Sequence, residues 1–102
     1  MSIKKKYYKT KDYCRISFRL PKEAVGDANT VHLVGEFNNW DKQATPLKKL
    51  KNGSFTGEIK LAENTEYQFR YLIDQQRWEN DHEADRYAPT PFGDSDNSIV
   101  IT

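Results

Sequence analysis

The sequence predicts an all-β domain, an antiparallel β-sandwich of the immunoglobulin-like type. Three observations predict it. Several short segments alternate apolar and polar residues with a period of two, turn-forming residues separate them at regular intervals, and no segment has the periodicity of a convincing helix. At 102 residues the chain is long enough for one such domain with a modest core.

The N-terminal stretch is basic and lacks a clear pattern. Its lysines are Lys4, Lys5, Lys6, Lys9 and Lys11. We interpret residues 1–11 as a solvated tail and residues 12–102 as the single β-sandwich domain.

Two strands are expected in the first part of the domain. Residues 13–20, YCRISFRL, alternate cleanly and predict a half-buried strand, with Cys14 on its buried side. Pro21 ends this strand, and residues 22–29 form a loop with room for one helical turn. A second strand is expected over residues 30–37, TVHLVGEF, which lead into a corner rich in glycine and asparagine.

The corner and the next hairpin contain residues with special backbone roles. We expect Gly35 and Gly57 to permit a bulge or a close approach of the backbone, and Asn38 or Asn39 to adopt a left-handed conformation. The pair Asn52-Gly53 is expected to supply the two positive-φ positions of a tight hairpin.

The most regular strand pattern lies at residues 66–74, EYQFRYLID. Alternation predicts one inward set and one outward set. The inward set is Tyr67, Phe69, Tyr71 and Ile73, and the outward set is Gln68, Arg70 and Leu72. A four-residue connection leads to Trp78, residues 79–97 are expected to form a long polar loop, and residues 98–102 a closing strand.

Composition and charge argue against several classes of partner. The net charge of +1 gives no long-range field for nucleic acid or an anionic membrane, so neither is expected as a partner. The single cysteine, Cys14, cannot form an intrachain disulfide and fits a reducing compartment. No apolar run has the length of a signal-peptide core or a membrane span, and we expect a cytoplasmic protein.

Polar clusters give little support for catalysis or metal binding. Glu79, Asp81, Glu83 and Asp85 lie along one polar loop, where we expect solvated, ionised carboxylates instead of a general acid with a raised pKa. His82 lacks a second histidine at zinc-ligand spacing. Residues 93–97, GDSDN, lack the remainder of a calcium loop. We therefore expect no enzyme, no metal and no cofactor.

Two tryptophans stand where a core does not obviously require them. Trp40 follows the corner GEFNNW, and Trp78 follows the turn after residues 66–74. Two interpretations remain open for each ring: an exposed platform, or a half-buried ring that covers the sandwich, which for Trp78 extends to burial in the core. An exposed indole can stack on the apolar face of a sugar ring for roughly 1–3 kcal/mol, so binding needs two or more platforms.

The order of these motifs resembles carbohydrate-binding module family 48, the isoamylase N-terminal or early set domains. VHLVGEFNNWDKQATPLKK is similar to the family's strand, Gly-x-Phe-Asn-x-Trp corner and proline-leucine turn. NGSFTGEIKLAENTEYQFRYLIDQQRW and FGDSDNSIVIT resemble its following segments. The likeness covers about residues 13–102 and implies an early set β-sandwich.

The resemblance implies a set of ligand-binding residues. It assigns both tryptophans to stacking, Arg70 to the position of a lysine, and the 92–97 loop to further contacts. The implied α-glucan site is Trp40, Arg70, Trp78, Phe92, Asp94, Asp96 and Asn97. This chain departs from the family pattern in Arg70, in Asp94 and Asp96, and in the turn before Trp78, which lacks the usual glycine and is one residue longer.

The sequence therefore predicts a non-catalytic module that binds α-1,4-linked glucan such as glycogen, starch or maltodextrin. The alternative is an early set module without a sugar site, which docks an enzyme of glucan metabolism or has an accessory role to a glycoside hydrolase of family 13. A third alternative is a hydrolase that uses the carboxylates of the polar loop.

Overall fold

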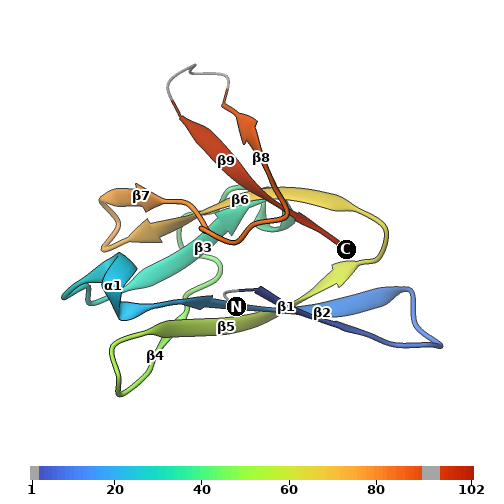
Figure 1. Ribbon diagram of the computed structural model, residues 1–102, viewed down its shortest axis with the longest axis horizontal. Coiled ribbons are helices and arrows are strands. Elements are labelled where there is room, and N and C mark those ends of the chain that lie inside the picture. Colours follow the sequence, from blue (N-terminus) through green and yellow to red (C-terminus); the bar gives the residue numbers. More distant parts are fainter. Residues whose placement is uncertain (1–2, 91–94) are drawn as a thin grey trace.

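The computed structural model describes residues 3–90 and 95–102, and these form two antiparallel sheets packed face to face (Figure 1). The predicted all-β sandwich is confirmed. Sheet A has the order β1-β2-β5-β4, and its strands are β1 (Ile3–Tyr7), β2 (Tyr13–Leu20), β5 (Phe55–Ala62) and β4 (Lys48–Lys49). Sheet B has the order β3-β6-β9-β8, and its strands are β3 (Val31–Gly35), β6 (Glu66–Ile73), β9 (Asp96–Ile101) and β8 (Arg86–Pro89).

Three short elements complete the fold. Strand β7 (Arg77–Glu79) pairs with the second half of β6, beyond the part of β6 that pairs with β9. Helix α1 (Lys22–Val25) is the single turn expected after Pro21. The 3-10 helix η1 (Glu36–Asn38) forms the corner after β3. No helix in residues 3–90 and 95–102 is long and apolar enough to cross a membrane.

The core lies between the sheets and consists of the inward residues of the alternating strands. Phe18, Phe69 and Tyr71 are fully buried there, and their rings contact edge to face in the order Phe18–Phe69–Tyr71. Phe37 packs against this core from the corner. Cys14 is buried as expected, and burial raises the pKa of its thiol.

The N-terminal stretch is a correction to the sequence prediction. Residues expected to form a solvated tail include β1, which pairs antiparallel with residues 14–18 of β2. Ile3 is buried, because its side chain points inward from β1 opposite Phe18. Three consecutive lysines follow Ile3, and one of them, Lys5, occupies a position opposite the buried Ile16, so the segment shows no apolar alternation and the strand was not predicted.

The loop expected over residues 79–97 is also a correction. Its first residue ends β7, residues 86–89 form β8, and the last two residues begin β9. In Figure 1 the β8–β9 hairpin rises away from the rest of sheet B. This hairpin forms one wall beside the outer face of β6.

The Asn52-Gly53 turn differs in detail from the tight hairpin expected. Gly53 has φ +89°, whereas Asn52 is not among the residues with positive φ. The amide of Gly53 donates to the carbonyl of Leu50, and the amide of Leu50 donates to the carbonyl of Ser54. A three-residue loop with one left-handed glycine therefore replaces the two-residue turn.

The outer face of sheet B is partly covered. Val34, Leu72 and Ile99 point outward from the main core but are at most 3% exposed. Leu72, expected on the solvent side, is buried because it pairs with both His32 and Trp78. These apolar residues give the sheet a second buried layer.

Candidate functional site

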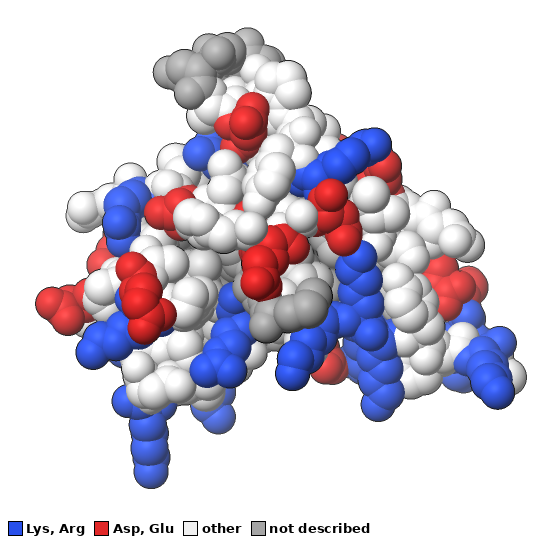
Figure 2. Space-filling model, viewed as in Figure 1, with Lys and Arg blue, Asp and Glu red and all other residues white. Residues whose placement is uncertain are grey.

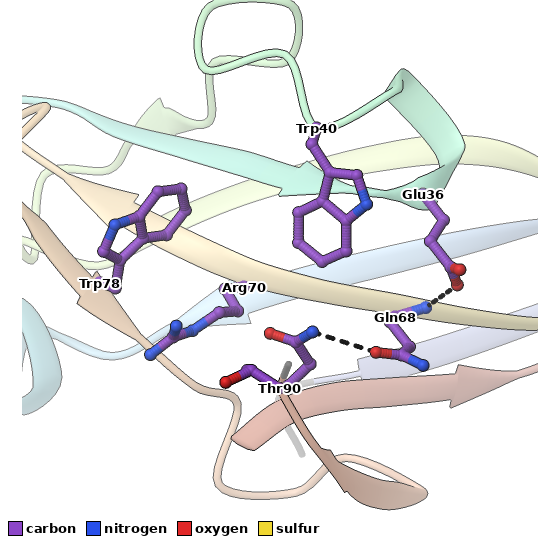
Figure 3. Close-up of a pocket in the computed structure, with 7 residues that line it drawn as sticks. Glu36, Trp40, Gln68, Arg70, Trp78 and Thr90 are labelled. Carbon is purple, nitrogen blue, oxygen red and sulfur yellow. Dashed lines mark hydrogen bonds between the residues drawn. The ribbon is translucent and has the colours of Figure 1, made fainter. Parts of the chain in front are cut away.

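Both tryptophans lie on the outer side of sheet B and remain accessible. Trp40 is 39% exposed and Trp78 is 36% exposed. They line the same pocket, which has a volume of about 500 Å³, and Figure 3 shows the two rings on one side of it, above Arg70. The remaining lining residues are Glu36, Gln68, Arg70, Thr90 and Asn97. The volume is within the range of roughly 300–1,000 Å³ typical of small-molecule sites.

Trp40 is placed by a corner that the sequence builds locally. A Cβ on Gly35 would lie 2.6 Å from the carbonyl oxygen of Gln68, so only glycine lets β3 meet β6 here. The side chain of Asn38 accepts the amide of Gly35 at 3.0 Å and donates to the carbonyl of Leu33 at 2.8 Å. Asn38 thus fixes the bend that lifts Trp40 over the sheet.

The backbone at Trp40 itself is unusual. Asn39 and Trp40 both have φ of 57°, in the left-handed region. Asparagine tolerates this conformation, but a bulky residue such as tryptophan rarely adopts it. The amide of Trp40 donates to the carbonyl of Gly35 at 2.8 Å, which closes the corner. The strain is kept at the residue whose ring reaches the pocket.

Trp78 is placed by the hairpin between β6 and β7. Asp74 and Gln75 have φ of 52° and 58°, so the chain reverses through two left-handed residues. The Asp74 carboxylate accepts the amide of Thr30 at 2.9 Å and that of Asn29 at 2.8 Å. These two hydrogen bonds lower the pKa of Asp74 below its ordinary value. Trp78 then pairs with Leu72 and faces outward.

Arg70 is the central cation of the pocket. Its guanidinium carbon is 5.6 Å from the centroid of the Trp78 ring, and the Lys42 ammonium lies 5.9 Å from the same centroid. The Nε of Arg70 is buried and has no hydrogen-bond partner among the described residues. A buried N–H without an acceptor costs free energy that a ligand oxygen would recover.

The other end of the pocket is polar. The backbone amide of Gln68 donates to Glu36 Oε1 at 2.6 Å, and Asn97 Nδ2 donates to the side-chain Oε1 of Gln68 at 3.0 Å (Figure 3). Glu36 reaches this end from the corner, and Asn97 reaches it from β9. Carboxylate and amide groups therefore line the wall next to the two indoles.

The structure brings part of the expected site together. Trp40, Arg70, Trp78 and Asn97 line one pocket. Asp96 is exposed and is not among the lining residues, and its carbonyl accepts a hydrogen bond from Asn80 at 2.8 Å. Phe92 and Asp94 lie outside the described residues.

Three lining residues were missed by the sequence interpretation. Alternation predicts Gln68 on the same outward face as Arg70, so the sequence contained a signal for Gln68, although Gln68 was not assigned to the site. Glu36 lies within the GEFNNW corner, four residues before Trp40. Thr90 follows β8, and its amide donates to the carbonyl of Ser95 at 3.0 Å. A strand that was not predicted could give no signal for Thr90.

The polar run after Trp78 is not uniformly solvated, contrary to expectation. Asp81 is fully buried and accepts a hydrogen bond from the Tyr71 hydroxyl at 2.6 Å. The amide of Asp81 donates to Ser98 Oγ at 2.9 Å. Burial, followed by the Asp81 charge, raises the pKa of Tyr71 well above 10. No cluster of three or more histidine, cysteine or carboxylate ligands occurs within residues 3–90 and 95–102.

Comparison with known proteins agrees with this geometry. The family described as the glycogen recognition site of AMP-activated protein kinase matches residues 23–102. Over 66 residues the chain is 37% identical to the 1,4-alpha-glucan branching enzyme GlgB of Aquifex aeolicus (strain VF5). That match covers 64% of this chain but only 10% of the enzyme, so the chain spans about a tenth of its relative's length.

The family match covers most of the chain, including the whole of sheet B and both tryptophans, and it confirms the resemblance to carbohydrate-binding module family 48. The chain belongs to the family described as the glycogen recognition site of AMP-activated protein kinase, and it is a non-catalytic glucan-binding module.

Proposed function

We propose that the ligand is an α-1,4-linked glucan and that the pocket on the outer face of sheet B holds it. The observation that carries the proposal is the presence in one pocket of two exposed indoles and a buried Arg70 N–H that has no hydrogen-bond partner among residues 3–90 and 95–102. Trp40 and Trp78 stack on glucose rings, while Arg70 and Asn97 bind hydroxyl groups. The family match supports glucan as the ligand class.

The polar wall extends the proposed site beyond the residues that the sequence suggested. Gln68 and Glu36 supply amide and carboxylate groups next to Asn97, and a sugar hydroxyl can both donate and accept. Phe92, Asp94 and Asp96 stay in the proposal on the family resemblance alone. The pocket is shallow, so we expect micromolar to millimolar affinity for a single site.

Titration calorimetry with maltoheptaose tests the proposal directly. The wild-type protein should bind with weak but saturable heat, and Trp40→Ala or Trp78→Ala should reduce affinity by about fivefold to 150-fold, because each ring contributes roughly 1–3 kcal/mol. Tyr7→Ala is the matched control, since Tyr7 is also an exposed aromatic residue but lies in β1 of the other sheet. No heat at millimolar maltoheptaose, or equal binding by all four proteins, would refute the proposal. Cellohexaose in the same cell tests the preference for α-1,4 over β-1,4 linkage.

We also propose a cytoplasmic enzyme of glucan metabolism as a protein partner. The similarity to a branching enzyme supports this idea, and one buried free cysteine fits a reducing compartment. Cross-linking in the producing cells, followed by mass spectrometry of the linked peptides and cell fractionation, checks both statements. Cross-links only to proteins without any role in glucan metabolism would contradict the proposed partner.

A further inference from the structure

The outer face of sheet A, opposite the pocket, carries a concentration of positive charge. We define the basic face as the outward, cationic positions of its strands. They are Lys4 and Lys6 on β1, Arg15 and Arg19 on β2, Lys48 on β4 and Lys60 on β5. All six are exposed. Figure 2 shows lysine and arginine side chains projecting along the lower edge of the view, where Figure 1 draws the strands of sheet A.

Three of these cations form a row across the sheet. Lys6 on β1 is directly opposite Arg15 on β2, and Arg15 is directly opposite Lys60 on β5. Directly opposed side chains of an antiparallel pair have Cβ atoms about 5 Å apart, and like charges in such positions destabilise the sheet. The row therefore carries an electrostatic cost that packing does not require.

Little on the face neutralises this row. Glu58 is the one carboxylate at an outward strand position of sheet A in the described residues, and it accepts hydrogen bonds from Arg15 at 3.5 Å and from Ser17 at 3.2 Å. The Lys60 ammonium lies 4.0 Å from the centroid of the Tyr13 ring, and this contact leaves its charge uncompensated.

Protection of a sheet edge accounts for only part of the pattern. Lysines on an edge strand discourage pairing with another chain, and Lys4 and Lys6 on β1 fit that role. Arg15 on β2 lies opposite Lys6 on one side and Lys60 on the other, so it protects no edge. Strand β4 pairs only with Phe55 and Thr56 of β5, so Lys60 lies on an open part of β5 and fits the edge role. The interior cation Arg15 needs another explanation.

The charge is also segregated over the whole chain. Only three of its lysines and arginines follow Lys60: Arg70, Arg77 and Arg86. More than half of its aspartates and glutamates follow the same residue. Sheet A thus bears the positive side of a nearly neutral molecule, and in Figure 2 the acidic side chains lie mostly above the basic edge.

We propose that the basic face docks a carboxylate-rich surface of a partner protein. The arginine fork of Arg15 and of Arg19 pairs with carboxylates in a bidentate way, and the flat sheet suits a flat protein surface. The aromatic ring nearest the row, Tyr13, is covered by Lys60, so it offers no stacking platform for a nucleic acid base. Apart from Tyr13, the outward positions of the sheet A strands hold no large apolar side chain to insert into a bilayer.

The two functional surfaces of the molecule then lie on opposite sheets. The pocket is on the outer side of sheet B, and the basic face is on the outer side of sheet A. A docked partner would leave Trp40 and Trp78 free. The module would therefore hold a glucan and an acidic protein at the same time.

Poly-L-glutamate serves as the carboxylate probe. We expect it to bind the wild-type protein at about 50 mM NaCl, with affinity that falls as salt rises. The double variant Lys6→Glu/Lys60→Glu should bind at least about tenfold more weakly. The double variant Lys22→Glu/Lys51→Glu makes the same change in net charge outside the sheet A strands and should stay within about threefold of wild type.

Stability separates a docking defect from misfolding. Lys6→Glu/Lys60→Glu puts an opposite charge on each side of Arg15, so its melting temperature should not fall below that of wild type. Maltoheptaose binding, measured separately, should be the same for wild type and both double variants. Absence of maltoheptaose binding by the wild type would contradict the proposed glucan site and would leave the docking proposal untouched.

Three results would overturn the inference. One is equal binding of poly-L-glutamate by the wild type and by Lys6→Glu/Lys60→Glu. Another is an equal loss in both double variants, since this would show a general charge effect. The third is binding of polyuridylate or of phosphatidylserine-containing vesicles in the absence of poly-L-glutamate binding.

Discussion

Arg70 and Trp40 are held in conformations that a residue chosen for stability alone would avoid. Arg70 keeps a buried N–H without a partner in the described part of the chain, and Trp40 keeps a left-handed backbone. Each feature costs free energy in the unliganded protein and each faces the same pocket. At the scale of single residues, we therefore expect replacement of these side chains to weaken ligand binding without a matching loss of stability.

The Arg70→Met variant tests this at the cation. Methionine keeps part of the apolar stem, and no buried N–H is left unpaired, so thermal stability should equal or exceed that of wild type. Affinity for maltoheptaose should fall roughly fivefold to tenfold, or about 1–1.5 kcal/mol. Calorimetry and thermal denaturation measure the two quantities. Arg86→Met, on β8 outside the pocket, is the control, and equal affinities would remove Arg70 from the site.

The backbone strain at Trp40 gives a second test. Trp40→Gly and Trp40→Ala both remove the indole, so both should lose maltoheptaose binding. Glycine adopts φ of 57° freely, whereas alanine does not, so the glycine variant should be more stable than the alanine variant by about 1 kcal/mol. Chemical denaturation compares the two. Equal stability would mean that the corner relaxes once the ring is gone.

At the scale of elements, the β6–β7 hairpin decides where Trp78 points. Its turn is fixed by the Asp74 carboxylate, which accepts two amides from residues 29 and 30. The turn lacks glycine, yet Asp74 and Gln75 both adopt positive φ. Bonds to another segment thus replace the backbone freedom that a glycine would supply.

The pH dependence of stability tests the Asp74 contacts. The folded protein lowers the pKa of Asp74 below its unfolded value of about 4, so the unfolded chain takes up the proton more readily. This contribution to stability is present above about pH 4 and is lost as the pH falls through the folded pKa. Melting temperatures of wild type and Asp74→Asn should therefore differ at pH 7 and converge at low pH. A constant difference between pH 7 and about pH 2 would contradict this origin.

At the scale of the whole molecule, a buried polar network joins strands that are distant in the sequence. Tyr71 on β6 donates to Asp81, and Asp81 donates through its amide to Ser98 on β9. Tyr87 on β8 also donates its hydroxyl to the carbonyl of Asp81. The network connects β6 with the β8–β9 hairpin, and that hairpin carries Asn97 to the pocket.

The Tyr71→Phe variant measures what this network contributes. Phenylalanine removes one donor from a buried carboxylate, so the free energy of unfolding should fall by about 1–3 kcal/mol. Wild type should also lose stability above about pH 10, because burial raises the pKa of Tyr71 and the unfolded tyrosine ionises first. Denaturation curves at pH 7 and at alkaline pH check both effects. An unchanged stability at pH 7 would show that Asp81 does not depend on this hydroxyl.

Much of the sandwich could be predicted because period-two alternation is a local property. Residues 13–20 and 66–73 became β2 and β6 with the expected inward sets, since the sequence itself assigns sides once a strand forms. Strands β1 and β8 were missed for the matching reason. Strand β1 is rich in lysine and β8 has only four residues, and pairing with a neighbour stabilises each of them.

The sequence by itself determined the all-β class, the strands that alternate, and the corner and tryptophans that resemble a glucan-binding family. Only the tertiary structure decided that β7 folds back on β6, so that Trp78 covers Leu72 on the same side as Trp40 and Arg70. It also decided that β8 and β9 bring Thr90 and Asn97 to them. The physical reason is the sequence separation of the interactions. Alternation along one segment specifies which face of a strand is buried, whereas pairing between distant segments specifies which residues of different strands lie side by side.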